Sequence, residues 1–216
     1  MTDIGYIGID PGMRRVAVTS NLPDGDWTTE VFVYQHKRHT DRLHELEAWT
    51  LDWPSRYITG NPTIVLAVEA PLGQLQGKAR WMPAFWWTIT RTLERFLSSD
   101  VCPAQDWEAG KLPPLLCLDP SPASVKKFVV GKGNANKGQM LVRIVEHWRD
   151  ELPETLRAPV AEGDYEKVSD ELESYAMARL AECAADVTLG AVGPWYKYQL
   201  DAVRDVLAKT ARAVGA

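Results

Sequence analysis

Residues 4–20 run IGYIGIDPGMRRVAVTS, and this stretch decides the fold class. Residues 4–10 are short, apolar and β-branched, and they end at a Pro-Gly turn. Residues 15–20 follow with alternating valines, which is typical of a second strand. We therefore expect two antiparallel strands, with Asp10 exposed at the turn where the first strand ends.

The rest of the chain alternates between strand and helix patterns. A third strand is expected at 28–34, after the turn at 21–26, and the continuous apolar run at 63–69 indicates a strand buried on both faces. Periodicity and turn residues predict a helix at 39–57, a helix at 83–97, a short strand at 115–118, helices at 121–130, 137–149, 169–187 and 195–214, and an acidic loop or mobile insertion at 150–167. This order predicts an α/β fold with a mixed five-stranded sheet flanked by helices.

The bulk composition limits the classes of protein to consider. A chain of 216 residues with 45% hydrophobic residues suits one domain, which we place at 1–216 with a core at about 4–187 and a C-terminal helical extension at 195–214. Its net charge of -5 weighs against nucleic-acid binding unless a local basic patch exists. The odd count of three cysteines, without a CxxC pair, disfavours a disulfide framework or a zinc site.

Four acidic residues stand where chemistry is plausible. Asp10 ends the first strand and Glu69 ends the strand at 63–69, while Asp170 and Glu173 share one face of the helix at 169–187. Each has an ordinary explanation: an Asp that caps a turn, a first solvated residue, or acids that favour a first helical turn capped by Ser169. Glu171 lies in the same helical turn, and we expect it to be a decoy, an acid that takes no part in the chemistry.

Taken together, the four acids predict a metal site. Clustered carboxylates repel one another unless cations lie between them. Hard oxygen ligands suit Mg²⁺, and Mn²⁺ is expected to substitute. Two such ions about 4 Å apart would activate a water and stabilise the leaving oxygen in phosphodiester cleavage.

Four lysines lie close together along the chain, within twelve positions around the glycine-containing turn at 131–133: Lys126, Lys127, Lys132 and Lys137. Glycines let backbone N–H groups approach a phosphate, and the lysines supply positive charge. The alternative is a solvated helix face beside a flexible loop. We expect all four to bind DNA.

The chain has nine tryptophans, and Trp81, Trp86 and Trp87 lie in one segment. These three could stack on unpaired bases. Tryptophans at helical spacing more often belong to a core or an interface, and we favour that interpretation.

Several of these blocks, in this order, resemble the RuvC-type Holliday junction resolvases of the RNase H-like superfamily. Residues 8–12 (GIDPG) resemble the opening motif of that family, Glu69 its strand-end glutamate, residues 125–140 (VKKFVVGKGNANKGQM) the stretch after its fifth strand, and residues 170–178 (DELESYAMA) its last acidic helix.

The resemblance implies an RNase H-like fold and a magnesium-dependent endonuclease that cuts four-way DNA junctions. It places Asp10, Glu69, Asp170 and Glu173 as catalytic metal ligands and Lys126 and Lys137 as contacts to DNA phosphate.

This chain also departs from the family pattern. Glu173 stands where the family more often has Asp, and an acidic insertion occupies 151–167. The family's aromatic wedge has Leu72 at its nearest position here, and the helix from Trp195 has no counterpart. These differences leave cleavage preference and strict junction specificity open.

Paired incision of a near-twofold junction calls for two active sites, so we expect a homodimer. Its predicted interface is the helix at 83–97, where Phe85, Trp86, Ile89 and Leu93 recur at helical spacing. Trp195 and the last helix are the second choice.

Three other functions stay open. One is a less selective nuclease for branched, flap or fork DNA. Another is an actin-like phosphotransferase, although we find no second glycine-rich nucleotide loop. The third is a catalytically silent junction-binding module, which the presence of all four acids disfavours.

The expected location is the cytoplasm, that of a host cell if the source is viral. The start of the chain does not resemble a signal peptide, and no apolar run approaches the length of a membrane span. We expect no membrane partner.

Overall fold

The computed structural model describes residues 4–21, 26–57, 63–71, 81–97, 112 and 115–214. Its centre is a five-stranded sheet of order β3-β2-β1-β4-β5. The strands are β1 (Ile4–Pro11), β2 (Arg15–Asn21), β3 (Trp27–Val33), β4 (Thr63–Val68) and β5 (Leu115–Leu118). The first three pair antiparallel, whereas β4 runs parallel to both β1 and β5. The predicted mixed sheet is confirmed.

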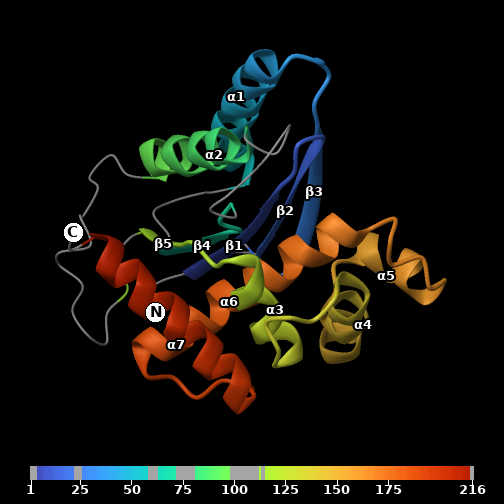
Figure 1. Cartoon of the computed structure of the whole chain (residues 1–216), viewed down its shortest axis with the longest axis vertical. Helices are drawn as coiled ribbons and strands as arrows, with labels where there is room; N and C mark the ends of the chain where they lie inside the picture. Colours follow the sequence, from blue (N-terminus) through green and yellow to red (C-terminus); the bar gives the residue numbers. More distant parts are fainter. Residues whose placement is uncertain are drawn as a thin grey trace.

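Helices cover both faces of the sheet (Figure 1). One face carries α1 (His39–Tyr57) and α2 (Met82–Leu97). The other carries α3 (Pro122–Val130), α4 (Lys137–Trp148), α5 (Glu154–Ala161), α6 (Ser169–Leu189) and α7 (Lys197–Val214).

The alternation of side chains along β4 explains why both faces are covered. Ile64, Leu66 and Val68 join the hydrophobic cluster that includes α1 and α2. Val65 and Ala67 join the cluster formed with the helices of the opposite layer. The continuous apolar run at 63–69 therefore belongs to a strand buried on both sides, as predicted.

The segment at 150–167 is not a loop, so that prediction is wrong. It contains a short 3-10 helix (Arg149–Glu151) and α5. Pro153 precedes the first turn of α5, where a missing N–H costs nothing, and Pro159 lies inside the helix. Burial of Leu156 and Val160 in the core compensates for the lost hydrogen bond.

The predicted dimer interface on α2 is also wrong for most of its residues. Phe85, Ile89 and Leu93 are fully buried in the core of their own protomer. They are therefore unavailable to a second chain, and of the tryptophans on this helix Trp87 is the exposed one, at 55%.

Trp195, the second choice for an interface, is part of an internal aromatic cage. The guanidinium of the buried Arg179 lies over the rings of Trp27, Trp148 and Trp195, at 5.6, 5.6 and 5.3 Å from their centroids. Trp195 also donates a hydrogen bond to Asp186 at 2.7 Å. The cage fixes the entry to α7 against α6, so Trp195 serves the fold of its own chain.

Among the helices of the described residues, none has both the length and the apolar character needed to cross a membrane.

Candidate active site

Two of the predicted acids meet because their strands are parallel neighbours. In the register of β1 and β4, Ile9 lies opposite Val68, so the next residues, Asp10 and Glu69, reach the same edge of the sheet. The Glu69 N–H donates to the carbonyl of Ile9 at 3.2 Å and continues the pairing.

The other two acids lie on the first two turns of α6, which packs closely against β1. An added Cβ at Gly8 would lie 2.1 Å from the carbonyl oxygen of Ser174 and 2.2 Å from the N of Ala178. Only glycine permits this approach, because any side chain would overlap the helix backbone. Gly8 therefore sets the distance between α6 and the strand that carries Asp10.

Three carboxylates form one cluster. Asp10, Glu69 and Glu173 each offer an oxygen, and these oxygens lie within 4.8 Å of one another. Three partly buried carboxylates at this separation match the hard oxygen ligands of Mg²⁺ or Mn²⁺. The donor set thus fits the predicted metal.

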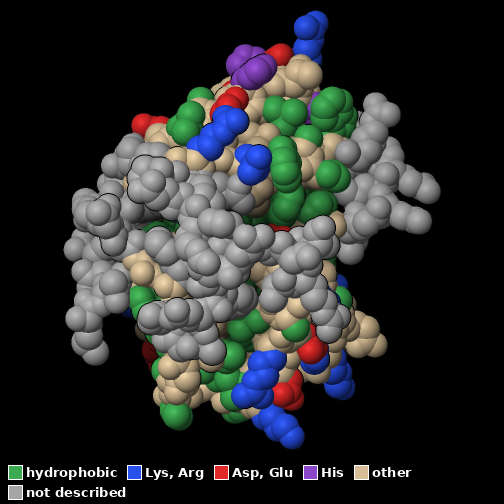
Figure 2. All heavy atoms as spheres, turned by 90° about the vertical axis from the view of Figure 1, so that its left-hand side faces the viewer, with side chains coloured by type: hydrophobic (Ala, Val, Ile, Leu, Met, Phe, Trp, Pro, Cys, Tyr) green, Lys and Arg blue, Asp and Glu red, His purple; other side chains and the backbone are tan. Residues whose placement is uncertain are grey.

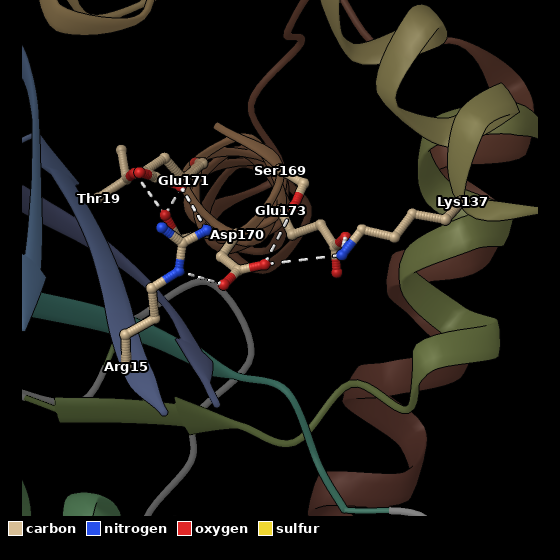
Figure 3. A network of polar contacts seen from close by, with 8 residues as sticks. Arg15, Thr19, Lys137, Ser169, Asp170, Glu171 and Glu173 are labelled. Atoms are coloured by element: carbon tan, nitrogen blue, oxygen red, sulfur yellow. Dashed lines mark hydrogen bonds and ion pairs between the residues drawn. The ribbon is translucent and has the colours of Figure 1, made fainter. Parts of the chain in front are cut away.

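Asp170 lies beside this cluster and is held by other groups (Figure 3). Its Oδ2 accepts from Arg15 Nε at 2.7 Å, and its Oδ1 accepts from Ser169 Oγ at 3.1 Å. Lys137 Nζ lies 3.6 Å from the same Oδ1. Asp170 is therefore linked to the cluster through Lys137, while Arg15 of β2 holds its carboxylate in place.

Burial and mutual repulsion shift the ionisation of the clustered acids. Burial, followed by the charges of Glu173, Glu69 and Asp170, raises the pKa of Asp10 well above its usual value. Burial and then Glu173 raise the pKa of Glu69 to about 7. The pKa of Glu173 is raised as well, chiefly by burial. A bound cation would relieve all three effects.

Asp170 shifts in the opposite direction. Burial acts to raise its pKa, but the hydrogen bond and charge of Arg15, together with Lys137, outweigh burial and hold the pKa below its usual value. Asp170 is thus ionised at neutral pH without a metal.

The four predicted DNA-binding lysines do not share one location. Lys137 begins α4, directly after the capping residue Asn136, and its Nζ lies 2.6 Å from Glu173 Oε1. The charge of Lys126 acts against the rise in the pKa values of Glu69 and Glu173, so Lys126 lies within electrostatic range of both acids. Lys127 instead pairs with Asp205 of α7 at 2.7 Å, and Lys132 is exposed in the turn between α3 and α4.

Sequence reasoning missed Arg15, and it misassigned Ser169. Arg15 begins β2 directly after the turn that follows Asp10, and a basic residue at that place was the available signal. Ser169 was predicted to cap α6, but it is the first residue of the helix, whose capping position is Val168. Its hydroxyl orients Asp170 instead.

Glu171, the expected decoy, lies 3.6 Å from Arg15 Nη2 and outside the three-carboxylate cluster. Leu72 lies outside the described residues.

Comparisons with known proteins support the fold. No protein-family model matches the chain, and no curated protein matches it. The solved structure of RuvC from T. thermophilus in complex with a Holliday junction substrate is similar, with a TM-score of 0.52, 15% sequence identity and coverage of 88% of this chain and 97% of that one. A second Thermus thermophilus RuvC structure has a TM-score of 0.42, 13% identity and coverage of 98% and 96%. At such identities the likeness concerns the fold alone: this chain has an α/β fold of the RNase H-like kind.

Proposed function

We propose that this protein is a magnesium-dependent endonuclease that resolves four-way DNA junctions. The observation that carries the proposal is the convergence of Asp10, Glu69 and Glu173 within 4.8 Å, from two strands and a helix distant in sequence. Asp170 and Lys137 lie at the rim of this cluster, and the charge of Lys126 acts on Glu69. The combination of oxygen ligands with adjacent lysines suits a phosphodiester substrate.

The roles of the residues follow from their positions. Asp10, Glu69 and Glu173 would hold the metal, and Asp170 would complete the acidic set with its orientation fixed by Arg15. Bound Mg²⁺ would supply an activated water and stabilise the leaving oxygen. Lys137 and Lys126 place positive charge beside the acids, where they would hold the scissile phosphate.

The junction as substrate is the finer part of the proposal. It is supported by the likeness to RuvC, which was solved with a Holliday junction substrate, and by the sequence blocks described above. Paired incision would require a homodimer with two symmetry-related sites. The alternative is a less selective nuclease for flap or fork DNA.

Cleavage of a synthetic four-way junction tests the proposal. With Mg²⁺ the wild type should make two symmetric nicks, and without it none. Asp10→Asn should lower cleavage by more than about 100-fold, because loss of a metal ligand should exceed the 10–100-fold cost of removing an outer partner. Junction binding should persist, because the phosphate contacts remain.

Two neighbouring residues on α6 provide a matched comparison. Glu173→Gln should abolish cleavage, whereas Glu171→Gln should keep most of it, because Glu171 lies outside the cluster. Cleavage of flaps and forks at rates equal to that of the four-way junction would favour the less selective nuclease. Full activity in chelator would refute the metal mechanism.

A further inference from the structure

A groove of about 840 Å³ opens beside the candidate active site, between α4 and the segment that leads into α6. Lys137, Leu141 and Val142 line one side, and Tyr165, Glu166 and Ser169 line the other. Its size falls within the range of about 300–1,000 Å³ typical of pockets that enclose small organic groups.

The groove adjoins the acid cluster because one of its lining residues, Lys137, contacts the cluster, and another, Ser169, contacts Asp170 beside it. Lys137 Nζ lies 2.6 Å from Glu173 Oε1, and Ser169 Oγ donates to Asp170 Oδ1 at 3.1 Å. A DNA strand with one phosphate at the acids would therefore present its next nucleotide to this groove.

The outer wall of the groove is an ordered part of the fold. After α5, Gly163 adopts a left-handed φ of 80°, and Asp164 N donates to the carbonyl of Pro159 at 2.9 Å. Asp164 also forms an ion pair with Lys167. Tyr165 packs against the core cluster that holds Leu156 and Val160. The wall is thus fixed before any ligand arrives.

The chemistry of the groove favours a base over a phosphate. Tyr165 and Val142 offer aromatic and aliphatic surface, and Val142 is 43% exposed. The outer wall carries the carboxylates of Asp164 and Glu166 and the ammonium of Lys167, which pairs with Asp164, so its net charge is negative and would repel a phosphate. The positive charge of Lys137 lies at the end where the groove meets the acids.

We infer that this groove is a subsite for the base of the nucleotide next to the scissile phosphate. The inference rests on the proposed function and assigns a role to the acidic segment at 150–167, which forms one wall. Stacking against Tyr165 and contact with Val142 would hold the base while Lys137 holds the adjoining phosphate.

Val142→Glu tests the subsite because a longer, charged side chain at this exposed helical position would obstruct the groove. The matched control is Val192→Glu, since Val192 is 101% exposed and lies outside the groove. Both variants should unfold at the wild-type temperature, which excludes damage to the fold as the cause of any difference.

The measurement combines each variant with an abasic site in the DNA. Nick positions are first mapped with the wild type, and an abasic site then replaces each nucleotide flanking the scissile phosphate in turn. Junction affinity is measured in the Asp10→Asn background, which keeps the DNA intact. Loss of the base at one of these positions should weaken binding by about 5- to 160-fold when Val142 is present, as expected for one lost stacking contact.

The Val142→Glu variant should bind the intact junction correspondingly less tightly and lose no more than about 2-fold on removal of the base, because effects on one contact are not additive. The Val192→Glu control should keep the full abasic penalty. If removal of the base weakens junction binding equally in Val142→Glu and Val192→Glu, while the wild type still cleaves, the subsite is overturned and the proposed function stands. Failure of the wild type to bind or cut any branched DNA would overturn both.

Discussion

At the scale of single residues, Arg15 separates the role of Asp170 from the roles of the other three acids. Its Nε donates a hydrogen bond to Asp170 Oδ2 at 2.7 Å and keeps that carboxylate ionised, whereas the pKa values of Asp10 and Glu69 are raised. Asp170 would therefore already be ionised and held in place when a metal binds, whereas Asp10 and Glu69 would have to release protons.

This arrangement predicts that metal-free protein becomes less stable as the pH rises. The unfolded carboxyl of Glu69 ionises near 4.5, but its folded pKa is about 7, so the folded state retains protons that the unfolded chain has released. Stability is greatest below the unfolded pKa and falls as the pH rises through the folded one. The unfolding temperature in chelator should drop between about pH 5 and pH 8.

Millimolar Mg²⁺ should reverse that loss at pH 8, because binding to the folded state stabilises it. Asp10→Asn serves as the control: it removes one repelling charge, so both the pH dependence and the response to metal should shrink. A rise in unfolding temperature with pH in the metal-free wild type would contradict the assigned cluster.

The lysines allow a second prediction at this scale, based on two adjacent residues. Lys126→Gln should weaken DNA binding and reduce the slope of log affinity against log salt by about 0.9, the value for one lost phosphate contact on duplex DNA. Lys127→Gln should change the slope less, because Lys127 is paired with Asp205 on α7. Equal slopes for Lys126→Gln and the wild type would remove Lys126 from the DNA interface.

At the scale of elements, the contact between β1 and α6 assembles the site, and Gly8 governs it. Gly8→Ala would press a methyl group into the α6 backbone at 2.1 Å from Ser174 O. Overpacking of this kind costs about 1–3 kcal/mol or more, and the displaced helix should also bind metal more weakly.

Gly138→Ala is the matched control because an added Cβ there meets only Asn136 Oδ1, at 3.5 Å. Gly138 is the second residue of α4, where alanine should raise the free energy of unfolding by less than the value of about 1 kcal/mol for a helix interior. Urea unfolding compares the two variants, and equal stability of Gly8→Ala and the wild type would show that α6 does not depend on this close approach.

Most elements could be predicted from sequence because their patterns are local. The alternation in β2 and the apolar run of β4 specify strands, and the acids at the ends of β1 and β4, Asp10 and Glu69, could be recognised as strand-end groups. α5 could not be predicted, because Pro153 and Pro159 suggested a loop while burial of Leu156 and Val160, a tertiary effect, stabilises the helix.

Three of the four predicted acids meet in the structure, and the predicted Lys137 contacts one of them, but the partners of Arg15 and Lys127 could not be predicted. The pairing of Arg15 with Asp170 joins residues 155 positions apart, and the ion pair between Lys127 and Asp205 joins residues 78 apart. Neither contact leaves a local pattern. The sequence could thus indicate which residues carry charge, but only the packing of α6 and α7 determines which charges meet.

At the scale of the whole molecule, a net charge of -5 is compatible with a DNA substrate because charge is distributed unevenly. Carboxylates cluster where a metal would neutralise them, Lys137 pairs with Glu173, and the charge of Lys126 acts on Glu69. The local field at the site, rather than the total charge, would govern the approach of DNA.

The proposed paired incision leads to a final prediction, which concerns assembly. A dimer cannot use most of the residues first predicted for its interface. Phe85, Ile89 and Leu93 are buried, and Trp195 packs against Arg179 of its own chain. We expect a dimer to use the exposed side of the α1–α2 layer instead. Hydrophobic side chains are visible on that layer, at the top of Figure 2. Trp87 on α2 is exposed, with the Arg91 guanidinium 4.9 Å from its ring, an aromatic and arginine pair of the kind that anchors interfaces.

Trp87→Glu should therefore convert a homodimer into a monomer, and Tyr196→Glu, at a residue of almost equal exposure, should not. Trp87 is 55% exposed and Tyr196 54%, so the two changes add the same charge at comparable cost to the monomer. Sedimentation at micromolar concentration gives the oligomeric state, and nick mapping shows whether paired incision becomes single. A wild type that stays monomeric even on junction DNA would remove the paired-incision mechanism and leave a nuclease that cuts one strand at a time.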